Sequence, residues 1–392
     1  MKRAMLIPMF FVAFIFVSQF SLYAQQVDTT GFRPLLQLKW EQSGVKGMNL
    51  GFVTRSGQRY TESFGAAVWT EDLPLGANHI FRIASMTKAI TSVAVLQLYE
   101  KGLISLDERA EKYLPGIDLI PVLMPDGELR QGRVPITIRH LLTHTSGFGY
   151  ALFDQRLAGF EQPQGWLYAD FPRLAEAGSE WIYGTGTDWA GKIVEAVSGL
   201  SLEDYFRKHI LGPLNMGHTW FNVPDSLQHL IVSIGRRDNL PNGAIRELPE
   251  RVPAKPTQNY SRGGGLFSSL NDYLTFLECI LRGGELNGAR ILCQQTVELM
   301  FTDQLPSILG LSKEETQNHE RMAHSLIWAI QLTDNEFGRL AGSAYWSGYF
   351  NTYYSIDNNS GIAVVAMSNL LPFLDRGALQ LYKEFEWLVR RP

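Results

Sequence analysis

The sequence predicts a mixed α/β protein of the α+β type, in which one sheet is built from both ends of the chain and a helical region is inserted between its two parts. Strand-like runs lie near the start of the chain, at 47–53 and 59–66, and again near its end, at 326–332, 349–356 and 361–369. The chain between them consists mainly of helical patterns and loops. Because each layer must bury its apolar face against another, we expect the terminal strands to share one sheet covered by helices.

Five helices are expected, each recognised by its apolar periodicity and by a residue that begins or ends it. Glycine ends a helix readily because it adopts the left-handed conformation, and serine begins one by capping free N–H groups. The expected helices run from about 85 to Gly102, from 187 to 198 before Gly199, from 202 to 210 after Ser201, from 269 to 281 before Gly283-Gly284, and from 374 to 389. Turns are expected at Ser56-Gly57 and at 357–360, and a surface loop at 241–256.

The first 24 residues are typical of a secretory signal peptide. Lys2 and Arg3 precede a nearly uninterrupted apolar run from 5 to 17, and Ala24 supplies a small residue at the point of cleavage. The run is short for a membrane span, and an uncleaved N-terminal anchor is the alternative interpretation. We therefore expect an exported protein, periplasmic or secreted, with no stable membrane anchor.

The rest of the chain, residues 25–392, is expected to form a single domain. Its sheet would come from about 30–80 and 325–392, and its helical region from about 85–320. A hydrophobic content of 45% supports a substantial core for a chain of this length. No internal repeat and no low-complexity segment divides it.

The composition disfavours several classes of partner. Lys and Arg number 35 against 39 Asp and Glu, and loss of residues 1–24 would remove two basic residues and no acidic one, changing the net charge from −4 to −6. A mildly acidic chain without a basic run does not favour nucleic acid or an anionic membrane surface. Cys279 and Cys293 are interpreted as free thiols in preference to a disulfide. With no Cys/His cluster of metal-ligand spacing, we expect neither a metal nor another cofactor.

The most informative motif is Ser85-Met-Thr-Lys88, at the start of the helix that ends at Gly102. Positions i and i+3 share a helix face, so Lys88 is expected one turn from the Ser85 hydroxyl. A serine at a helix N-terminus also has free N–H groups beside it, which suits a nucleophile and half of an oxyanion hole. The same pattern at Ser43-Gly-Val-Lys46 contains a glycine, has no long apolar helix behind it, and is interpreted as chance.

Two further segments could complete such a site. Tyr183 stands in a Gly-rich turn before a helix, where it could relay protons, although a packing tyrosine is the alternative. Trp346-Ser347-Gly348 is expected to open the strand 349–356. Its small residues would let a ligand approach the strand edge, and the Tyr349 N–H could be a second oxyanion donor. The alternative is an ordinary strand entry with a buried tryptophan.

Other candidate motifs are weaker. The stretch 139–147 holds His140, His144 and Ser146, but the chain has no Gly-x-Ser-x-Gly elbow and no zincin pattern. We interpret that stretch as a structural loop lining the cleft. The glycine-rich stretch 261–269 lacks the Walker lysine and the dinucleotide spacing, so it is interpreted as close backbone packing beside a helix start.

In their order and spacing these motifs resemble the serine β-lactamase and penicillin-binding-protein superfamily, and most nearly its class C β-lactamase-like branch with the family VIII carboxylesterases. The similarity covers most of the chain beyond residue 24. It is carried by the segments 81–88, 101–108, 112–115, 141–147, Tyr183, 263–268, 283–288 and 346–348. The resemblance implies an antiparallel sheet flanked by helices, with the active site between the sheet and the helical region.

The resemblance also implies a role for each candidate residue. Ser85 would be the acylated nucleophile, Lys88 the group that lowers its pKa and a candidate base, and Tyr183 the proton relay. The backbone N–H groups of Ser85 and Tyr349 would form the oxyanion hole. The substrate-binding positions that it implies are Thr185, Trp346, Ser347 and Gly348.

Two of these positions depart from the β-lactamase pattern. Thr185 stands where those enzymes have an asparagine that contacts an acylamino group, and Trp346 stands where they have a lysine. Losing that cation would forfeit about 1.5–3 kcal/mol of charge-assisted hydrogen bonding to a carboxylate. The esterase branch tends to carry tryptophan there, so both departures favour neutral acyl esters over β-lactams.

The expected function is an exported serine hydrolase, a carboxylesterase that cleaves small acyl esters through an acyl-enzyme on Ser85. Alternatives on the same scaffold are a peptidase or amidase for D-amino-acid peptides, a weak β-lactamase and an acyltransferase. A non-catalytic module that binds cell-wall fragments belongs to a different class, which the presence of Ser85, Lys88 and Tyr183 together disfavours. The expected partner is a small-molecule ester or amide.

Overall fold

The structure is a computed structural model, and it describes residues 26–391 except 72, 239–242, 250–251, 253–256 and 258. The expected signal peptide at 1–24 lies outside the described residues and stays a prediction. Much of the expected loop 241–256 lies outside them too. Its described part contains a strand, Ile245–Leu248 (β8), which pairs with Ile234–Arg237 (β7). The loop prediction was wrong there, because the flanking prolines and glycine hid a short segment whose backbone is satisfied by β7.

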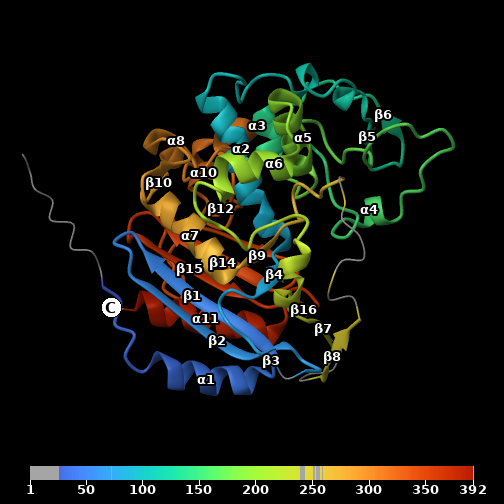
Figure 1. The fold of residues 1–392 in the computed structure, drawn as a ribbon. Helices are drawn as coiled ribbons and strands as arrows, with labels where there is room; N and C mark the ends of the chain where they lie inside the picture. Colours follow the sequence, from blue (N-terminus) through green and yellow to red (C-terminus); the bar gives the residue numbers. More distant parts are fainter. Residues whose placement is uncertain are drawn as a thin grey trace, which may run out of the picture.

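One antiparallel sheet forms the base of the molecule (Figure 1). Among the described residues its strands run in the order β12-β13-β14-β15-β1-β2-β3. They span Gly47–Thr54 (β1), Arg59–Val68 (β2), Leu73–Pro74 (β3), Ala329–Ile330 (β12), Ala344–Gly348 (β13), Thr352–Asp357 (β14) and Ile362–Met367 (β15). The N- and C-terminal parts meet where β1 pairs with β15, with Asn49 opposite Met367. The prediction of one sheet built from both ends of the chain is confirmed.

The hairpin of β13 and β14 differs from its prediction. Trp346-Ser-Gly348 does not open the strand that follows but ends β13, and residues 349–351 form the turn into β14. Asn351 takes a left-handed φ of 57° in this turn. Its side-chain amide donates to the carbonyl oxygens of Leu370 and Pro372, which fixes the turn in place.

The run 326–332 forms a strand only at β12. The Ser325 hydroxyl oxygen accepts the N–H groups of Ile327 and Trp328, and this tight turn occupies the residues before β12. In the described chain β12 pairs with β13 at Ala344 and Tyr345, and on its other side Ala329 forms a single bridge with His324. Within the described chain, the edge of β13 from Trp346 onward therefore has no strand beside it.

Helices cover both faces of the sheet. Phe32–Ser43 (α1) and Arg376–Arg390 (α11) lie on one face, and Leu270–Leu281 (α7) lies on the other (Figure 1). Every residue of β1 is buried, because both of its faces are covered. The α1 segment falls within the region 30–80 that was expected to supply strands, so that expectation was wrong for it. Only Phe32 and Leu36 of this helix are buried, which explains its weak apolar signal.

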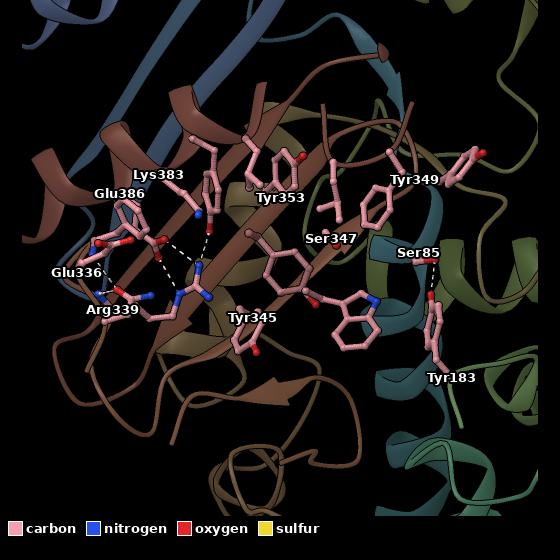
Figure 2. Close-up of a pocket in the computed structure, with 18 of the residues that line it drawn as sticks. Ser85, Tyr183, Glu336, Arg339, Tyr345, Ser347, Tyr349, Tyr353, Lys383 and Glu386 are labelled. Atoms are coloured by element: carbon pink, nitrogen blue, oxygen red, sulfur yellow. Dashed lines mark hydrogen bonds and ion pairs between the residues drawn. The ribbon is translucent and has the colours of Figure 1, made fainter. Parts of the chain in front are cut away.

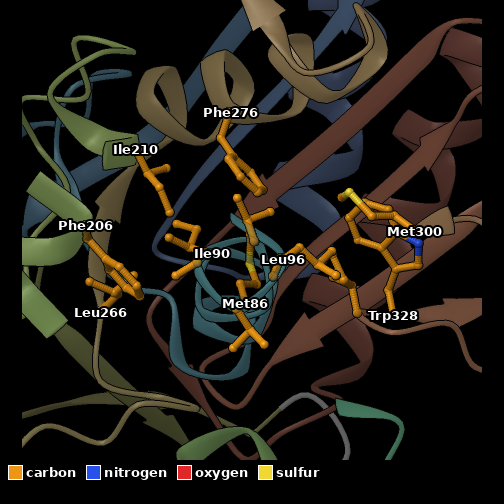
Figure 3. Close-up of a cluster of buried hydrophobic side chains, with 14 of the residues drawn as sticks. Met86, Ile90, Leu96, Phe206, Ile210, Leu266, Phe276, Met300 and Trp328 are labelled. Atoms are coloured by element: carbon orange, nitrogen blue, oxygen red, sulfur yellow. The ribbon is translucent and has the colours of Figure 1, made fainter. Parts of the chain in front are cut away.

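The helical region packs around Thr87–Glu100 (α2), the helix that follows Ser85. Every α2 residue from Thr87 to Leu98 is buried. Figure 3 shows the surrounding cluster, including Met86, Ile90, Leu96, Phe206, Ile210, Phe276 and Trp328. Burial of each such side chain contributes about 1.5–3 kcal/mol, so the position of α2 is strongly fixed. The helix ends as predicted, with Gly102 at a φ of 66° and the Leu103 N–H donating to the Leu98 carbonyl.

The other expected helices are confirmed with small differences. Gly186–Ser198 (α5) ends at Gly199, and Ser201 caps Leu202–Phe206 (α6). Beyond α6 the chain continues as a π-helical turn, Arg207–Leu211, and not as α-helix. The remaining α-helices and strands of the described chain are short: α3 (Ile138–Leu142), α4 (Gln155–Ala158), α8 (Gln294–Leu299), α9 (Leu305–Leu309), α10 (Lys313–Gln317), β4 (Ile80–Arg82), β5 (Val122–Leu123), β6 (Leu129–Arg130), β9 (Phe267–Ser269), β10 (Glu285–Leu286), β11 (Ala289–Arg290) and β16 (Leu370–Leu371). Single 3-10 turns lie at Ala110–Lys112 and Ile117–Leu119, and a longer one at Asp225–Leu230.

Both cysteines are unpaired, as expected; Cys279 is buried and Cys293 is partly exposed. In the part of the chain that the structure describes, no helix is long and apolar enough to cross a membrane. The same residues contain no group of three or more His, Cys, Asp and Glu side chains that could hold a metal ion.

Candidate active site

Ser85 lies in a single 3-10 turn, Ala84–Met86, between β4 and α2. Ala84 has a φ of 44°, a strained conformation for a residue with a side chain and one that is found at functional sites. Gly348, at the end of β13, packs against this turn. A Cβ on Gly348 would lie 2.2 Å from the carbonyl oxygen of Ile83, so only glycine allows the sheet edge and the Ser85 turn to meet.

The Lys88 side chain is buried, and its ammonium group is fully hydrogen-bonded. Its Nζ donates to Ser85 Oγ at 3.3 Å, to the Tyr150 hydroxyl at 3.1 Å and to the Gly263 carbonyl oxygen at 2.8 Å. Three acceptors match the three N–H bonds of an ammonium group. The structure thus places Lys88 one helical turn from Ser85, as the spacing predicts.

The groups around Lys88 favour its protonated form. Burial alone would lower the pKa of Lys88, but the oxygens of Tyr150 and Tyr183 and the Asp188 carboxylate outweigh burial, and the pKa lies above its ordinary value. Asp188 is connected to the lysine through Tyr150, whose hydroxyl donates to Asp188 Oδ2 at 3.3 Å. The pKa of Tyr150 is raised, chiefly by burial, so this hydroxyl keeps its proton. Lys88 therefore presents a fixed positive charge to Ser85.

The glycine-rich stretch 261–269 closes over Lys88. The Gly263 N–H donates to Asp188 Oδ1 at 3.0 Å while its carbonyl oxygen accepts from Lys88. A Cβ on Gly263 would lie 2.5 Å from Asp188 Oδ2 and 3.2 Å from Lys88 Nζ. The expectation of close backbone packing is confirmed, and the packing partners are residues of the site.

Tyr183 reaches Ser85 from the loop before α5. Its hydroxyl donates a hydrogen bond of 2.6 Å to Ser85 Oγ. Behind it, the ring centroid of His144 lies 4.9 Å away and that of Trp346 lies 5.2 Å away. His144 is buried and packs behind the Tyr183 ring, so its stretch, 139–147, has a structural role. The expectation of a loop lining the cleft is corrected, because the stretch begins within the helix Ile138–Leu142 and none of its residues lines the cavity.

The backbone N–H groups of Ser85 and Tyr349 are candidates for an oxyanion hole. Tyr349 is the first residue of the turn between β13 and β14. Neither N–H donates a hydrogen bond to another described residue, and both residues line one cavity. Free N–H groups beside a nucleophile are the donors that stabilise a developing oxyanion. By contrast, the chance motif at Ser43 ends α1, and its hydroxyl donates to the Trp40 carbonyl at 2.6 Å.

A cavity of about 490 Å³ begins at Ser85 and runs along the open edge of β13 toward α11 (Figure 2). This volume falls within the range of small-molecule sites. Its middle is aromatic, and the end away from Ser85 carries charged side chains, as Figure 2 shows. The aromatic lining includes Phe153, Trp181, Tyr183, Tyr345, Trp346, Tyr349, Tyr353 and Phe373.

Of the four substrate-binding residues expected from the sequence, two line the cavity and two do not. Trp346 and Ser347 line the cavity. Thr185 is not among the lining residues, because its hydroxyl donates to the Asp170 carboxylate at 2.6 Å. Gly348 is not among them either, since it packs on the Ser85 turn. For Thr185 and Gly348 the expectation is corrected: both hold the site together instead of lining the space for a ligand.

Tyr150 and Asp188 were not predicted from the sequence as members of the site. Both lie beside motifs that were recognised, since Tyr150 follows the stretch 139–147 and Asp188 lies in the first turn of α5. A lysine in an apolar helix signals that acceptors must lie nearby, because a buried charge without partners is very costly. That signal does not say which of the 15 tyrosines, or which acid, supplies them.

An antiparallel sheet with a serine, a lysine and a tyrosine clustered at its edge defines the class of serine enzymes with the β-lactamase and penicillin-binding-protein fold. The chain belongs to the Beta-lactamase family, whose profile matches residues 32–386. The protein is therefore a serine enzyme of the hydrolase and acyltransferase type, and the expected resemblance and fold are confirmed.

Named relatives include both transferases and an esterase. The monacolin J acid methylbutanoyltransferase of Aspergillus terreus is 31% identical over 370 residues, covering 84% of this chain and 87% of its own. The lovastatin esterase of Penicillium rubens is 32% identical over 258 residues, covering 60% and 62%. The unliganded structure of simvastatin synthase (LovD) from Aspergillus terreus matches with a TM-score of 0.81 at 27% identity, covering 93% of this chain and 98% of that one.

Two buried histidines behind Tyr183 predict a loss of stability in acid. Burial lowers the pKa of His324 to about 4 and that of His144 well below its ordinary value, so both are neutral in the folded protein. The unfolded chain binds these protons nearer pH 6.5, and stability therefore falls as the pH drops below that value. For His324 alone the loss reaches about 3 kcal/mol by pH 4. Urea unfolding at neutral and acid pH should show it.

The matched variant is His324→Asn, which should lose less stability than the wild type between the two pH values. The exposed His319, changed in the same way, is the control for the loss of one histidine. A His324→Asn protein with the pH dependence of the wild type would show that this histidine is not held neutral by burial.

Proposed function

We propose that the protein forms an acyl-enzyme on Ser85 and releases the acyl group to water, so that it acts as a carboxylesterase on esters with no charged group near the bond that is cleaved. The observation that supports this most is the pair of contacts on Ser85 Oγ, from Tyr183 at 2.6 Å and from the buried Lys88 at 3.3 Å. A hydroxyl that faces both a proton-transferring group and a fixed positive charge is an activated nucleophile.

In the proposed acylation, Ser85 Oγ attacks the ester carbonyl carbon. The Ser85 proton passes to the Tyr183 oxygen while the proton of Tyr183 goes to the leaving alkoxide, which departs as the alcohol. The Lys88 ammonium stabilises the charge that builds on Ser85 Oγ, and the N–H groups of Ser85 and Tyr349 stabilise the charge on the carbonyl oxygen. Deacylation reverses the relay, with water in place of the alcohol.

The preference for esters over β-lactams rests on Trp346. Its ring plane lies within 13° of that of His144 at a centroid distance of 6.2 Å, and it forms an apolar wall of the cavity. The lysine that β-lactamases resembling this chain carry at this position would bind a substrate carboxylate. An indole offers no such charge, which favours neutral groups near Ser85.

Ser85→Ala should reduce hydrolysis of p-nitrophenyl acetate or butyrate at least about a thousandfold, because no acyl-enzyme can form. The measurement is release of p-nitrophenol together with mass spectrometry of the intact protein, which should show an acyl adduct only when Ser85 is present. Ser43→Ala, in the chance motif, is the matched control and should behave like the wild type. Full activity in Ser85→Ala would sink the proposal.

The cavity favours a second candidate, transfer of the acyl group from Ser85 to a bound alcohol. Its aromatic middle would bury a hydrophobic alcohol next to the acyl-enzyme and keep water away from it. The transferase relative is named for moving a methylbutanoyl group, so the same scaffold performs such a transfer. The acyl group can pass from Ser85 to water or to a bound alcohol. The ratio of hydrolysis to transfer then depends on how well the alcohol competes with water for the cavity.

During turnover of p-nitrophenyl butyrate, added benzyl alcohol should capture a larger share of the acyl group than ethanol at the same concentration. The reason is that the aromatic lining binds the benzyl ring and not the ethyl group. Chromatography of the products measures the amounts of benzyl butyrate and ethyl butyrate, and so the fraction of the butyryl groups that each alcohol has captured. Trp346→Ala should reduce the advantage of benzyl alcohol, and equal shares for the two alcohols would argue for simple hydrolysis.

We also propose that the protein is exported, because residues 1–24 have the charge, apolar run and small terminal residue of a signal peptide. Expression in a bacterial host should give a chain that begins at Gln25, found in the periplasm or the medium. Sequencing of the mature N-terminus and fractionation of the cells measure this. Replacing the apolar core of the segment with polar residues is the control, and an intact chain that stays in the cytoplasm in both cases would refute export.

A further inference from the structure

The end of the cavity away from Ser85 carries more positive charge than its ion pairs neutralise. Figure 2 shows Arg339 and Lys383 at that end, with Ser85 and Tyr183 at the other. Both side chains line the cavity, and so do the carboxylates of Glu336 and Glu386. The question is which of these charges is left for a ligand.

Arg339 is about nine-tenths buried, and one of its nitrogens is unused. Its Nε and Nη2 donate to the two oxygens of Glu386 at 3.0 and 2.8 Å, and Nη2 also donates to the Tyr382 hydroxyl at 3.3 Å. Its Nη1 has no hydrogen-bond partner among the described residues. The guanidinium group is therefore held rigidly by Glu386 while two of its N–H bonds remain open.

Lys383 stands one turn before Glu386 on α11. Its Nζ lies 4.6 Å from the centroid of the Phe337 ring, which supports the side chain, and it pairs with no carboxylate in the described part of the chain. The neighbouring Glu384 is occupied, because it accepts from Lys39 at 3.1 Å and from Gln380 at 3.0 Å. The ammonium of Lys383 is thus an unpaired cation on the cavity wall.

The carboxylates nearby do not cancel these charges. Both oxygens of Glu386 are engaged, since Oε1 also accepts from Ser355 at 2.5 Å and lies 3.5 Å from Arg390. Arg390 also lies beside the buried Asp357, with Nη1 3.7 Å from Oδ2. At this end of the cavity the buried carboxylates are Glu386 and Asp357. They face three cations, which are Arg339, Arg390 and Lys383, so one positive charge is in excess. The third carboxylate, Glu336, is exposed to solvent, where water and salt screen it.

We propose that this end of the cavity binds a carboxylate of the substrate, with Lys383 Nζ and Arg339 Nη1 as its donors. The preferred substrate would then be an ester with a hydrophobic body and an anionic group remote from the bond that Ser85 attacks. This inference rests on the proposed function of Ser85. It adds a charged anchor to a cavity whose lining is otherwise largely aromatic, and such an anchor would fix the position of the substrate along β13.

The test compares two series of p-nitrophenyl esters. In one, the acyl chain comes from a dicarboxylic acid, from succinic to dodecanedioic acid, and ends in a free carboxylate. In the other, the same chain ends in a methyl ester. At the chain length that spans the cavity, kcat/KM for the acid should exceed that for the methyl ester by about tenfold, the lower end expected for a charge-assisted contact to a partly exposed lysine.

Lys383→Met should abolish most of this preference, and Lys383→Arg should keep it. Glu336→Gln should change it little, because water and salt already screen this exposed carboxylate. Lys39→Met is the matched control: it removes a lysine beside α11 but outside the cavity, and the acid-to-ester ratio should not change. A ratio near one in the wild type, or a preference that survives in Lys383→Met, would overturn the proposal.

Binding separates this proposal from the function of Ser85. Calorimetric titration of the Ser85→Ala protein with the best acid and its methyl ester measures affinity without turnover. Tighter binding of the acid that depends on Lys383 supports the anchor even if the protein hydrolyses neither compound. Equal affinity for the two compounds refutes the anchor even if Ser85 proves to be the nucleophile.

Discussion

The site depends on the burial of one ammonium group. Lys88 lies in the first turn of α2, a helix that is buried from Thr87 to Leu98, and a charge without partners there would cost several kcal/mol. It is tolerated because three different segments bring acceptors to it: the Ser85 turn, the loop with Tyr150 and the glycine-rich stretch with Gly263. Any rearrangement of those segments would leave the lysine unsatisfied. The lysine therefore holds the geometry of the candidate site in place, as a buried polar network does when every member is paired.

The edge of the sheet decides where a substrate can lie. Because β12 is short, β13 offers an unpaired edge from Trp346 to the turn at Tyr349. Elsewhere such an edge would be a liability, since unpaired strands attract other strands. Here aromatic side chains and α11 enclose it, so that the free backbone groups face a cavity. The cavity and the candidate oxyanion donor at Tyr349 thus arise from one feature, the early end of β12.

The sequence predicted the parts of the structure that local patterns control. The strands β1 and β2, the helices with glycine or serine at their ends, and the Ser85–Lys88 spacing follow from periodicity and capping. Residues whose roles depend on distant contacts were missed or misplaced. Tyr150 and Asp188 gain their roles only through Lys88 and Gly263, and Gly348 is required by the carbonyl of Ile83, far away in the sequence. The β13 turn was misplaced because its position depends on Asn351 reaching Leu370 and Pro372.

The pairing of β1 with β15 has a consequence for the order in which the protein can fold. Asn49 meets Met367 across the centre of the sheet, so β1 has no partner on that side until nearly the whole chain has been synthesised. Contacts this remote in sequence close slowly, because the loop entropy is lost before the strands gain their pairing energy. The tryptophan and the tyrosine turn beside Ser85 also come from this late segment. A nascent chain therefore contains Ser85 long before Trp346 and Tyr349 can pack beside it, and the candidate site is complete only when the C-terminal strands have joined the sheet.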